Sequence, residues 1–569
     1  MARVVLDPVT RIEGHLRIEA EVAGGAVSDA WSSGTMFRGI ELIVRNRDPR
    51  ECWLWTQRIC GVCTMVHALA SVRAVENALQ IEVPNNARLV RNIIAATQHI
   101  QDHVIHFYHL HALDWVDVTS ALAADPAKTS QLAESISEWS KSSTTYYKGV
   151  LDRVKKLVES KQLSLLSSGY WGHPAYQLPP EANLLAVAHY LEALEFQRDF
   201  IRIHAVLGGK NPHLQTFLVG GMTTSMDVNE PNAPLNPERF DLIAQIAKSA
   251  KTFVDQVLIP DVLAVAGFYK DWFAIGAGPG NYLSYGAFPQ GKIGETDKYF
   301  QPQGVILNND LSKVYPVDPG KVAEYVTHSW YEYSDGDQAA KAPSVGETNP
   351  RYTGPKPPFD FLDVDQKYSW LKAPRYDDQV MEVGPLSRML VSYAAGNQET
   401  KTMIDGVLAK FNAPPTALFS TLGRIAARAL ETQLLANHLV EWIEELRANM
   451  NSGDLTMFNG EKWDPSTWPD SVRGYGLFEA PRGSLGHWVE IEDRVVKNYQ
   501  AVVPTTWNAG PRDAKGQRGP YETALLKTPI ADPERPLEIL RTLHSFDPCL
   551  ACAVHVVDAR GRAKASSAF

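Results

Sequence analysis

The chain has 569 residues, of which 44% are hydrophobic and 21% charged, and its formal net charge is −10. These proportions are ordinary for a soluble globular protein and exclude a disordered, collagen-like or coiled-coil chain. There is no basic excess, so no nucleic-acid partner is expected. No apolar run is long enough to predict a membrane span, and the first residues lack the apolar core of a signal peptide. We therefore expect a chain that is cytoplasmic or is exported with another protein's signal.

Hydrophobic periodicity divides the chain into blocks. Residues 3–30 alternate apolar and charged side chains, which predicts an antiparallel sheet within residues 1–48. Helical spacing of apolar residues follows over 64–80, from Pro84 onward, over 181–207 and over about 414–450. The predicted blocks are a helical core at 49–267 and 381–450, an irregular lobe at 268–380, and a C-terminal segment at 474–555 that begins with short strands.

No flexible linker separates these blocks, so a single integrated body over residues 1–555 is expected. The predicted fold class is α+β, mainly α. Long helices form a central bundle in this prediction, and small antiparallel β-sheets lie at its periphery.

Cysteine is scarce and unevenly placed. There are five: Cys52, Cys60, Cys63, Cys549 and Cys552. This number is too small for a disulfide scaffold, but four of them form two C-x-x-C pairs at opposite ends of the chain. Four thiolates suit Zn, an Fe–S cluster, Cu(I), or a thiolate-bound Ni or Fe centre. The spacing alone favours a structural zinc site, with a redox dithiol as the next alternative.

The residues beside the cysteine pairs extend this candidate site. His67 lies one helical turn after Cys63 and can donate to a sulfur; the alternative is a hydrogen-bonded core histidine. Asp547 precedes the second pair and is equally consistent with a helix cap. Cys52 lies outside both pairs and is expected to be a buried, inert thiol.

Six ordered motifs together carry a resemblance to a known family. They are Arg11-Ile12-Glu13-Gly14-His15, residues 58–63 (RICGVC) with His67, residues 102–115, residues 208–213 (GGKNPH), residues 479–483 (EAPRG) with Gly486-His487-Trp488, and residues 547–555. Over essentially the whole chain the sequence resembles the large subunit of [NiFe] hydrogenases. It is most similar to the uptake-type, membrane-associated enzymes, including the enterobacterial hydrogenase-2 type.

The resemblance implies two metal sites. Cys60, Cys63, Cys549 and Cys552 match the four thiolates that bind Ni, and Cys63 and Cys552 also match the pair that bridges to an Fe carrying CO and two cyanides. Position 549 is Cys, which excludes the selenocysteine variant. Glu41, the backbone carbonyl of Ala501, and His555 match the ligands of a second ion, usually Mg.

The resemblance also implies how H2 is split. H2 has no polar group to be recognised, so the metals must polarise its bond while a base, Cys549 or Arg482, takes the proton. Arginine is nearly always protonated, so electrostatic support from Arg482 is at least as reasonable as base action. Asp102 and Asp547 match carboxylates that hold Arg482. Pro481, Thr505 and His67 are expected beside the cofactor, Thr505 as a donor to cyanide. Glu13 matches a glutamate that passes protons outward.

A histidine-rich stretch follows Pro84. His99, His103, His106, His109 and His111 lie close together along one predicted helix. A further metal site is the weaker interpretation of this stretch. A proton route or a partner interface is favoured.

The implied function is H2 ⇌ 2H⁺ + 2e⁻, mainly in the uptake direction. All paired cysteines are used, so electrons must leave through an Fe–S small subunit that also supplies an export signal and a link to membrane electron-transfer subunits. This predicts a heterodimer, or a dimer of heterodimers, on the periplasmic face, with a cytoplasmic location as the alternative.

Residues 556–569 match a propeptide that an endopeptidase removes after His555.

Three other functions are alternatives to this one. An H2-sensing relative would generally lack the C-terminal extension. The quinone-site subunit of respiratory NADH dehydrogenase has lost the paired cysteines. A structural zinc protein would contain Zn without Ni.

Overall fold

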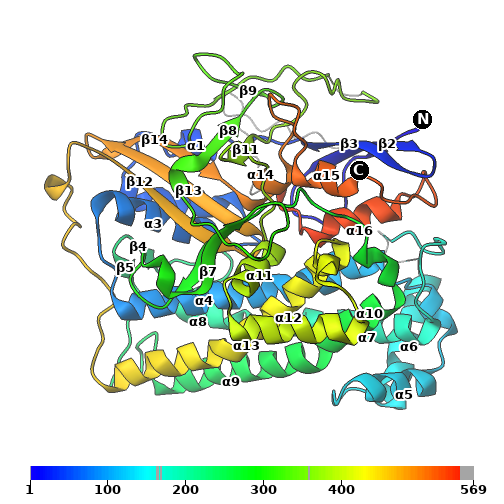
Figure 1. The fold of residues 1–569 in the computed structure, drawn as a ribbon. Coiled ribbons are helices and arrows are strands. Elements are labelled where there is room, and N and C mark those ends of the chain that lie inside the picture. Colours follow the sequence, from blue (N-terminus) through cyan, green and yellow to red (C-terminus); the bar gives the residue numbers. More distant parts are fainter. Residues whose placement is uncertain (1, 162–165, 167–168, 357–358, 551–569) are drawn as a thin grey trace.

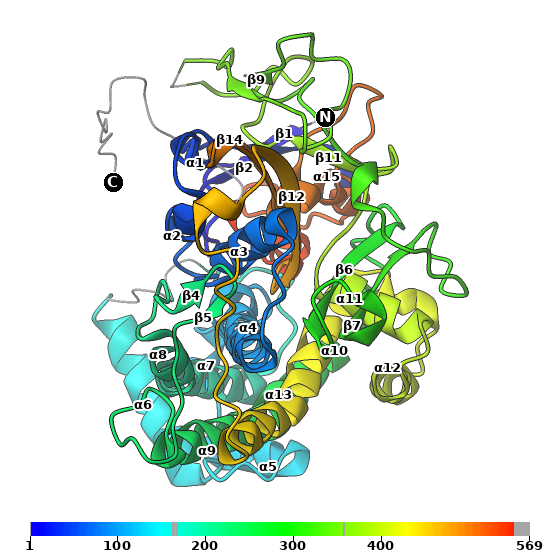
Figure 2. The same ribbon diagram turned by 90° about the vertical axis from the view of Figure 1, so that its left-hand side faces the viewer.

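The computed structural model describes residues 2–161, 166, 169–356 and 359–550. Figures 1 and 2 show two layers, with long helices in one and small antiparallel sheets in the other. No helix among the described residues is long and apolar enough to cross a membrane. The mainly helical α+β fold predicted from the sequence is confirmed. The division into the predicted blocks stays a prediction.

The helical layer is built around α4 (Asn85–Ile105) and α13 (Thr421–Asn451), which pack against each other. Both are buried along most of their length. Ser420 caps α13 by accepting a hydrogen bond from the backbone N–H of Gly423. The flanking helices are α3 (Val66–Leu79), α7 (Pro180–Phe200), α8 (Arg202–Gly208), α9 (Pro237–Phe253), α10 (Ile259–Phe268), α11 (Pro385–Ala394) and α12 (Gln398–Phe411).

The predicted helices occur with shifted ends. The stretch 181–207 is two helices, α7 and α8, which meet at Ile201. The last long helix begins at Thr421 instead of near 414, because the backbone of Phe419 and Ser420 leaves the helical region after a short turn at residues 415–418. Residues 106–111 after α4 form a π-helical turn.

Two three-stranded antiparallel sheets frame the region where the chain ends meet. The first has the order β1 (Ala2–Leu6), β2 (Leu16–Ala23), β3 (Ala26–Gly34), which confirms the predicted N-terminal sheet. Its apolar face packs against α15 (Pro520–Leu525) and α16 (Leu537–Ser545). The second has the order β12 (Ser471–Ala480), β13 (Gly483–Glu492), β14 (Val495–Val502), and β12 lies along α3 (Figure 1).

The region 268–380, predicted to be irregular, consists mainly of loops with short strand pairs. They are β6 (Tyr282–Pro289) with β7 (Tyr299–Ile306), β8 (Val322–Tyr325) with β11 (Ala373–Tyr376), and β9 (Tyr331–Glu332) with β10 (Asn349–Pro350). The remaining elements are α1 (Ile40–Ile43), α2 (Cys52–Thr56), α5 (Pro126–Ile136), α6 (Thr144–Glu159), β4 (Phe217–Leu218), β5 (Gly221–Met222) and α14 (Pro504–Ala509).

Candidate metal centre

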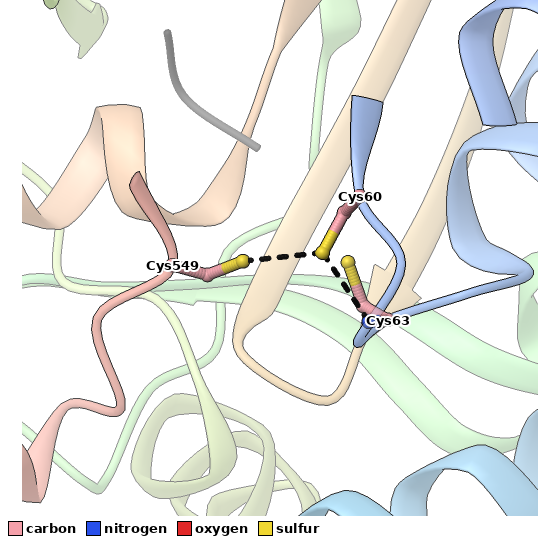
Figure 3. A group of neighbouring side chains, drawn as sticks. All are labelled: Cys60, Cys63 and Cys549. Atoms are coloured by element: carbon pink, nitrogen blue, oxygen red, sulfur yellow. Dashed lines mark hydrogen bonds between the residues drawn. The ribbon is translucent and has the colours of Figure 1, made fainter. Parts of the chain in front are cut away.

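Three cysteines from the two ends of the chain meet in the interior. Cys60 and Cys63 lie in the loop before α3, and Cys549 follows α16 (Figure 3). All three are buried, and their sulfur atoms lie within 4.8 Å of one another. The Sγ atoms of Cys60 and Cys549 are 3.5 Å apart. Among the described residues this is the only such group of His, Cys, Asp or Glu side chains that could hold a metal ion.

Main-chain contacts hold the C-terminal cysteine in place. The N–H of Leu550 donates to the carbonyl of Glu13 at 2.7 Å, so residues 13 and 549 pair as a short parallel bridge. The N–H of Cys549 donates to Oγ1 of Thr505, at the start of α14, at 3.1 Å. The N-terminal loop and α14 therefore fix Cys549 from two directions.

A small cavity adjoins the thiols. It is lined by Cys63, Val66, His67, Ala480, Arg482, Val503, Pro504, Thr505 and Cys549. Thiolates are soft ligands for Ni and Fe, while Arg482 and the Thr505 hydroxyl can donate hydrogen bonds to anionic groups. The donor set and the enclosed space thus fit a thiolate-bound metal centre with small anionic ligands.

Arg482 reaches the cavity from a two-residue turn between β12 and β13. Its Nη1 donates to Oδ2 of Asp102 at 3.0 Å, and its Nη2 lies 3.1 Å from Oδ1 of Asp547. Gly483 has a φ of +134°, and a Cβ there would lie 2.6 Å from Val383 Cγ2. A residue with a side chain could not form this turn without moving Val383.

The turn itself is held by a buried arginine that the sequence did not single out. Arg388 on α11 donates to the carbonyls of Ala480 at 2.8 Å and Pro481 at 2.9 Å. The same guanidinium pairs with Glu431 at 2.6 Å and Glu479 at 2.8 Å. These residues lie far apart in sequence, so no local pattern could have revealed the contact.

The electrostatics keep Arg482 charged. Burial alone would lower its pKa, but Asp547, Cys549 and Asp102 raise it well above the ordinary value of an arginine. Burial raises the pKa of Asp102 to about 7, although Arg482 opposes this change. A protonated guanidinium in this position can support negative charge in the cavity.

Glu13 provides a contact between the thiol group and the N-terminal loop. The Sγ of Cys549 donates to Oε2 of Glu13 at 3.3 Å, and Glu13 is half-buried. A thiol and a carboxylate at this separation can exchange a proton, and the carboxyl group can rotate to pass it on.

Two of the predicted second-ion residues lie in contact, but through the N–H of Ala501 and not through the carbonyl that is the predicted ligand. Oε1 of Glu41 accepts the N–H of Ala501 at 2.7 Å, and Nζ of Lys372 lies 3.7 Å from the same oxygen. The predicted ligands Cys552 and His555, and the predicted propeptide 556–569, lie outside the described residues.

The other candidate residues have structural partners. Cys52 is buried outside the cluster, and burial raises the pKa of its thiol to about 12, as expected for an inert cysteine. On the histidine-rich stretch, His103 pairs with Glu431, whereas the other four histidines bond backbone carbonyls: His99, His106, His109 and His111. The described residues thus give no further metal site there.

Comparison with known families identifies the chain. The family model described as nickel-dependent hydrogenase matches residues 38–555, and one described as HoxL-like matches residues 3–32. The chain belongs to the large-subunit family of nickel-dependent hydrogenases.

Relatives of this hydrogenase subunit match over nearly the full length. It is 51% identical to the uptake hydrogenase large subunit of Bradyrhizobium diazoefficiens, with 98% of this chain and 96% of the relative covered. It is 50% identical to the hydrogenase-1 large chain of Escherichia coli K12, with 98% and 95% covered. The expectation of a hydrogenase-2 subtype stays a prediction.

Solved structures agree with the fold. A variant of the [NiFeSe] hydrogenase from Desulfovibrio vulgaris Hildenborough superposes with a TM-score of 0.77 at 34% identity, with 97% of this chain and 99% of that chain covered. The selenium of that enzyme is not expected here, because position 549 of this hydrogenase subunit is Cys.

Proposed function

We propose that this subunit catalyses the oxidation of H2 to protons and electrons. The observation that carries the proposal is the buried group formed by Cys60, Cys63 and Cys549, beside a cavity that Arg482 closes. When bound, a nickel–iron centre supplies the redox and Lewis-acid chemistry that splits H2. The protein contributes the ligands, a fixed positive charge and an exit for the proton.

We assign the thiolates as the resemblance implies. Cys60, Cys63, Cys549 and Cys552 would hold the nickel–iron centre through their thiolates. Arg482 and the Thr505 hydroxyl would donate hydrogen bonds to the cyanide ligands of its Fe. Both donors line the cavity beside Cys63, which supports this arrangement.

The proton leaves through Cys549 and Glu13. Arg482 is held in its protonated form by Asp102 and Asp547, so the sulfur of Cys549 is the better base. The sulfur then passes the proton to Oε2 of Glu13, 3.3 Å away. Rotation of the carboxyl group delivers the proton away from the cavity.

A magnesium ion is proposed at Glu41, the Ala501 carbonyl and His555. Glu41 already contacts the main chain at position 501, which supports a shared site. A carboxylate, a carbonyl and waters are ligands that Mg²⁺ prefers.

The proposed assembly follows from the electron balance. Each H2 releases two electrons, and the chain's paired cysteines are committed to the metal centre, so an Fe–S small subunit must accept the electrons. We propose that this partner carries the complex to the periplasmic face of the membrane, and that an endopeptidase cuts after His555 once Ni is bound.

Metal analysis and infrared spectroscopy of the purified heterodimer test the proposal. We expect Ni and Fe in the large subunit, bands from CO and cyanide, and sustained H2-dependent reduction of a dye. Zn without Ni, and no such bands, would overturn it. Ni with only trace turnover would favour the H2-sensing alternative. The mass of the large subunit shows whether residues 556–569 have been removed.

A further inference from the structure

His67 reaches the metal cavity with only one of its ring nitrogens engaged. Its Nδ1 lies 3.0 Å from Nε2 of His487. Its Nε2 is buried and has no hydrogen-bond partner among the described residues, and the side chain lines the cavity beside Cys63. A buried polar atom without a protein partner in such a place indicates a contact with what fills the cavity.

A tyrosine completes a chain of three side chains. His487 lies on β13 and Tyr499 on β14, and the Nδ1 of His487 is 2.6 Å from the hydroxyl of Tyr499. All three residues are at most 1% exposed. His487 belongs to the Gly486-His487-Trp488 motif, to which the proposed function assigns no role.

A neutral imidazole has one N–H, so each ring must donate with one nitrogen and accept with the other. The Nδ1 of His67 and the Nε2 of His487 are 3.0 Å apart, so one of these nitrogens must accept the proton of the other and its ring is neutral. Burial raises the pKa of Tyr499 well above 10, so the phenol keeps its proton.

The donor strengths then fix the direction of the chain. A phenol O–H is a stronger donor than an imidazole N–H, and an imidazole nitrogen is the stronger acceptor. Tyr499 therefore donates to Nδ1 of His487, which places the proton of His487 on Nε2. That N–H donates to Nδ1 of His67, which leaves the proton of His67 on Nε2.

We propose that Tyr499 and His487 are positioning residues that set the tautomer of His67, so that its Nε2–H is presented as a hydrogen-bond donor to the thiolates of the metal centre. A hydrogen bond to a thiolate withdraws electron density from the metals. If the hydrogen bonds ran in the opposite direction, His67 would point the lone pair of its Nε2 at an anionic sulfur. This inference rests on the proposed function, since the acceptor is a metal-bound thiolate.

The test compares four variants of the heterodimer. His487→Leu removes the donor to His67, whereas His487→Gln can retain it through its amide N–H. Tyr499→Phe removes only the hydroxyl group. Tyr475→Phe is the matched control, because Tyr475 lies in the same sheet but is 40% exposed.

Two readouts are needed besides activity. In infrared spectra we expect the CO and cyanide bands to move to lower frequency in His487→Leu, to move less in Tyr499→Phe, and to stay close to the wild type in His487→Gln and Tyr475→Phe. Pulsed EPR can be recorded on enzyme labelled with ¹⁵N-histidine while its Ni is paramagnetic. We expect the hyperfine coupling between Ni and a histidine nitrogen to weaken most in His487→Leu and less in Tyr499→Phe. It should stay close to the wild type in His487→Gln and Tyr475→Phe.

The outcomes separate the two proposals. Unchanged bands and unchanged coupling in His487→Leu, with full Ni content, would overturn the tautomer assignment. Absence of CO and cyanide bands from the wild type would instead count against the proposed iron ligands, and the nitrogen coupling to Ni would then decide the role of His487 alone.

Discussion

Cys549 makes two contacts through one sulfur atom. Its sulfur lies 3.5 Å from that of Cys60, and the same sulfur contacts the carboxylate of Glu13. We predict that Cys549→Ser abolishes both Ni retention and H2 oxidation, because a serine hydroxyl stays protonated and is a poor ligand for Ni. Metal content and dye reduction measure the two effects. Cys52→Ala is the control, since Cys52 is buried outside the group, and it should keep its Ni. Full activity in Cys549→Ser would contradict the ligand assignment.

A variant of Glu13 separates the loss of the proposed proton exit from a loss of chemistry at the metal. Glutamine has the same shape as glutamate but cannot release a proton, so Glu13→Gln should lower H2 oxidation about 10²–10⁴-fold. Conversion of para- to ortho-H2 needs no proton exchange with water and should persist. The exposed Glu51→Gln variant serves as the control and should show neither change. If both activities of Glu13→Gln fell together, a relay role would be wrong.

The β12–β13 hairpin presents Arg482, and α11 and α13 hold that hairpin through Arg388 and Glu431. Glu431 is fully buried and accepts two hydrogen bonds from Arg388. Removing one partner of such a pair leaves a buried charge without compensation and costs about 3–5 kcal/mol. We predict that Glu431→Gln lowers the thermal unfolding midpoint at pH 7 and weakens H2 oxidation. Glu441→Gln, on the same helix but exposed, should change neither.

The same pair predicts a pH dependence. Burial alone would raise the pKa of Glu431, but Arg388 and His103 lower it well below 4.5. A depressed carboxyl pKa contributes stability above pH 4.5, and this contribution is lost as the pH falls through the folded-state value. The difference in unfolding midpoint between wild type and Glu431→Gln should therefore narrow below pH 4.5. A constant difference would argue against an ion pair.

Elements and site were predictable from the sequence to different degrees. Helical periodicity predicted α3 and α4, because their apolar residues recur at spacings of three and four. The start of α13 was misplaced because the apolar pattern continues through a proline turn. The four paired cysteines were identifiable as ligands of some metal, but only the ordered motifs indicated nickel. Arg388 and His487 act through contacts with residues distant in sequence, which periodicity and spacing cannot reveal.

At the scale of the whole molecule, the metal centre joins the two ends of one chain. The N-terminal sheet packs on α15 and α16, and the loop after β1 pairs with the residues around Cys549. The helical layer is held by packing between α4 and α13, and its apolar core continues to Cys60, Cys63 and Cys549. Contacts that join the chain ends and contacts inside the bundle can still differ in how strongly they depend on the metal, because the free energy of local opening varies across one structure.

Hydrogen exchange measures that dependence directly. A ligand that binds only the folded site stabilises it by mass action, so Ni should slow exchange where the two ends meet. In the Ni-loaded heterodimer we expect the N–H of Leu550, which donates to Glu13, to exchange more slowly than in Ni-free protein. Amides in the middle of α13 should exchange at the same rate in both, and Cys52→Ala should behave as the wild type. Equal protection of Leu550 with and without Ni would mean that packing of the N-terminal sheet on α16 alone holds the ends together.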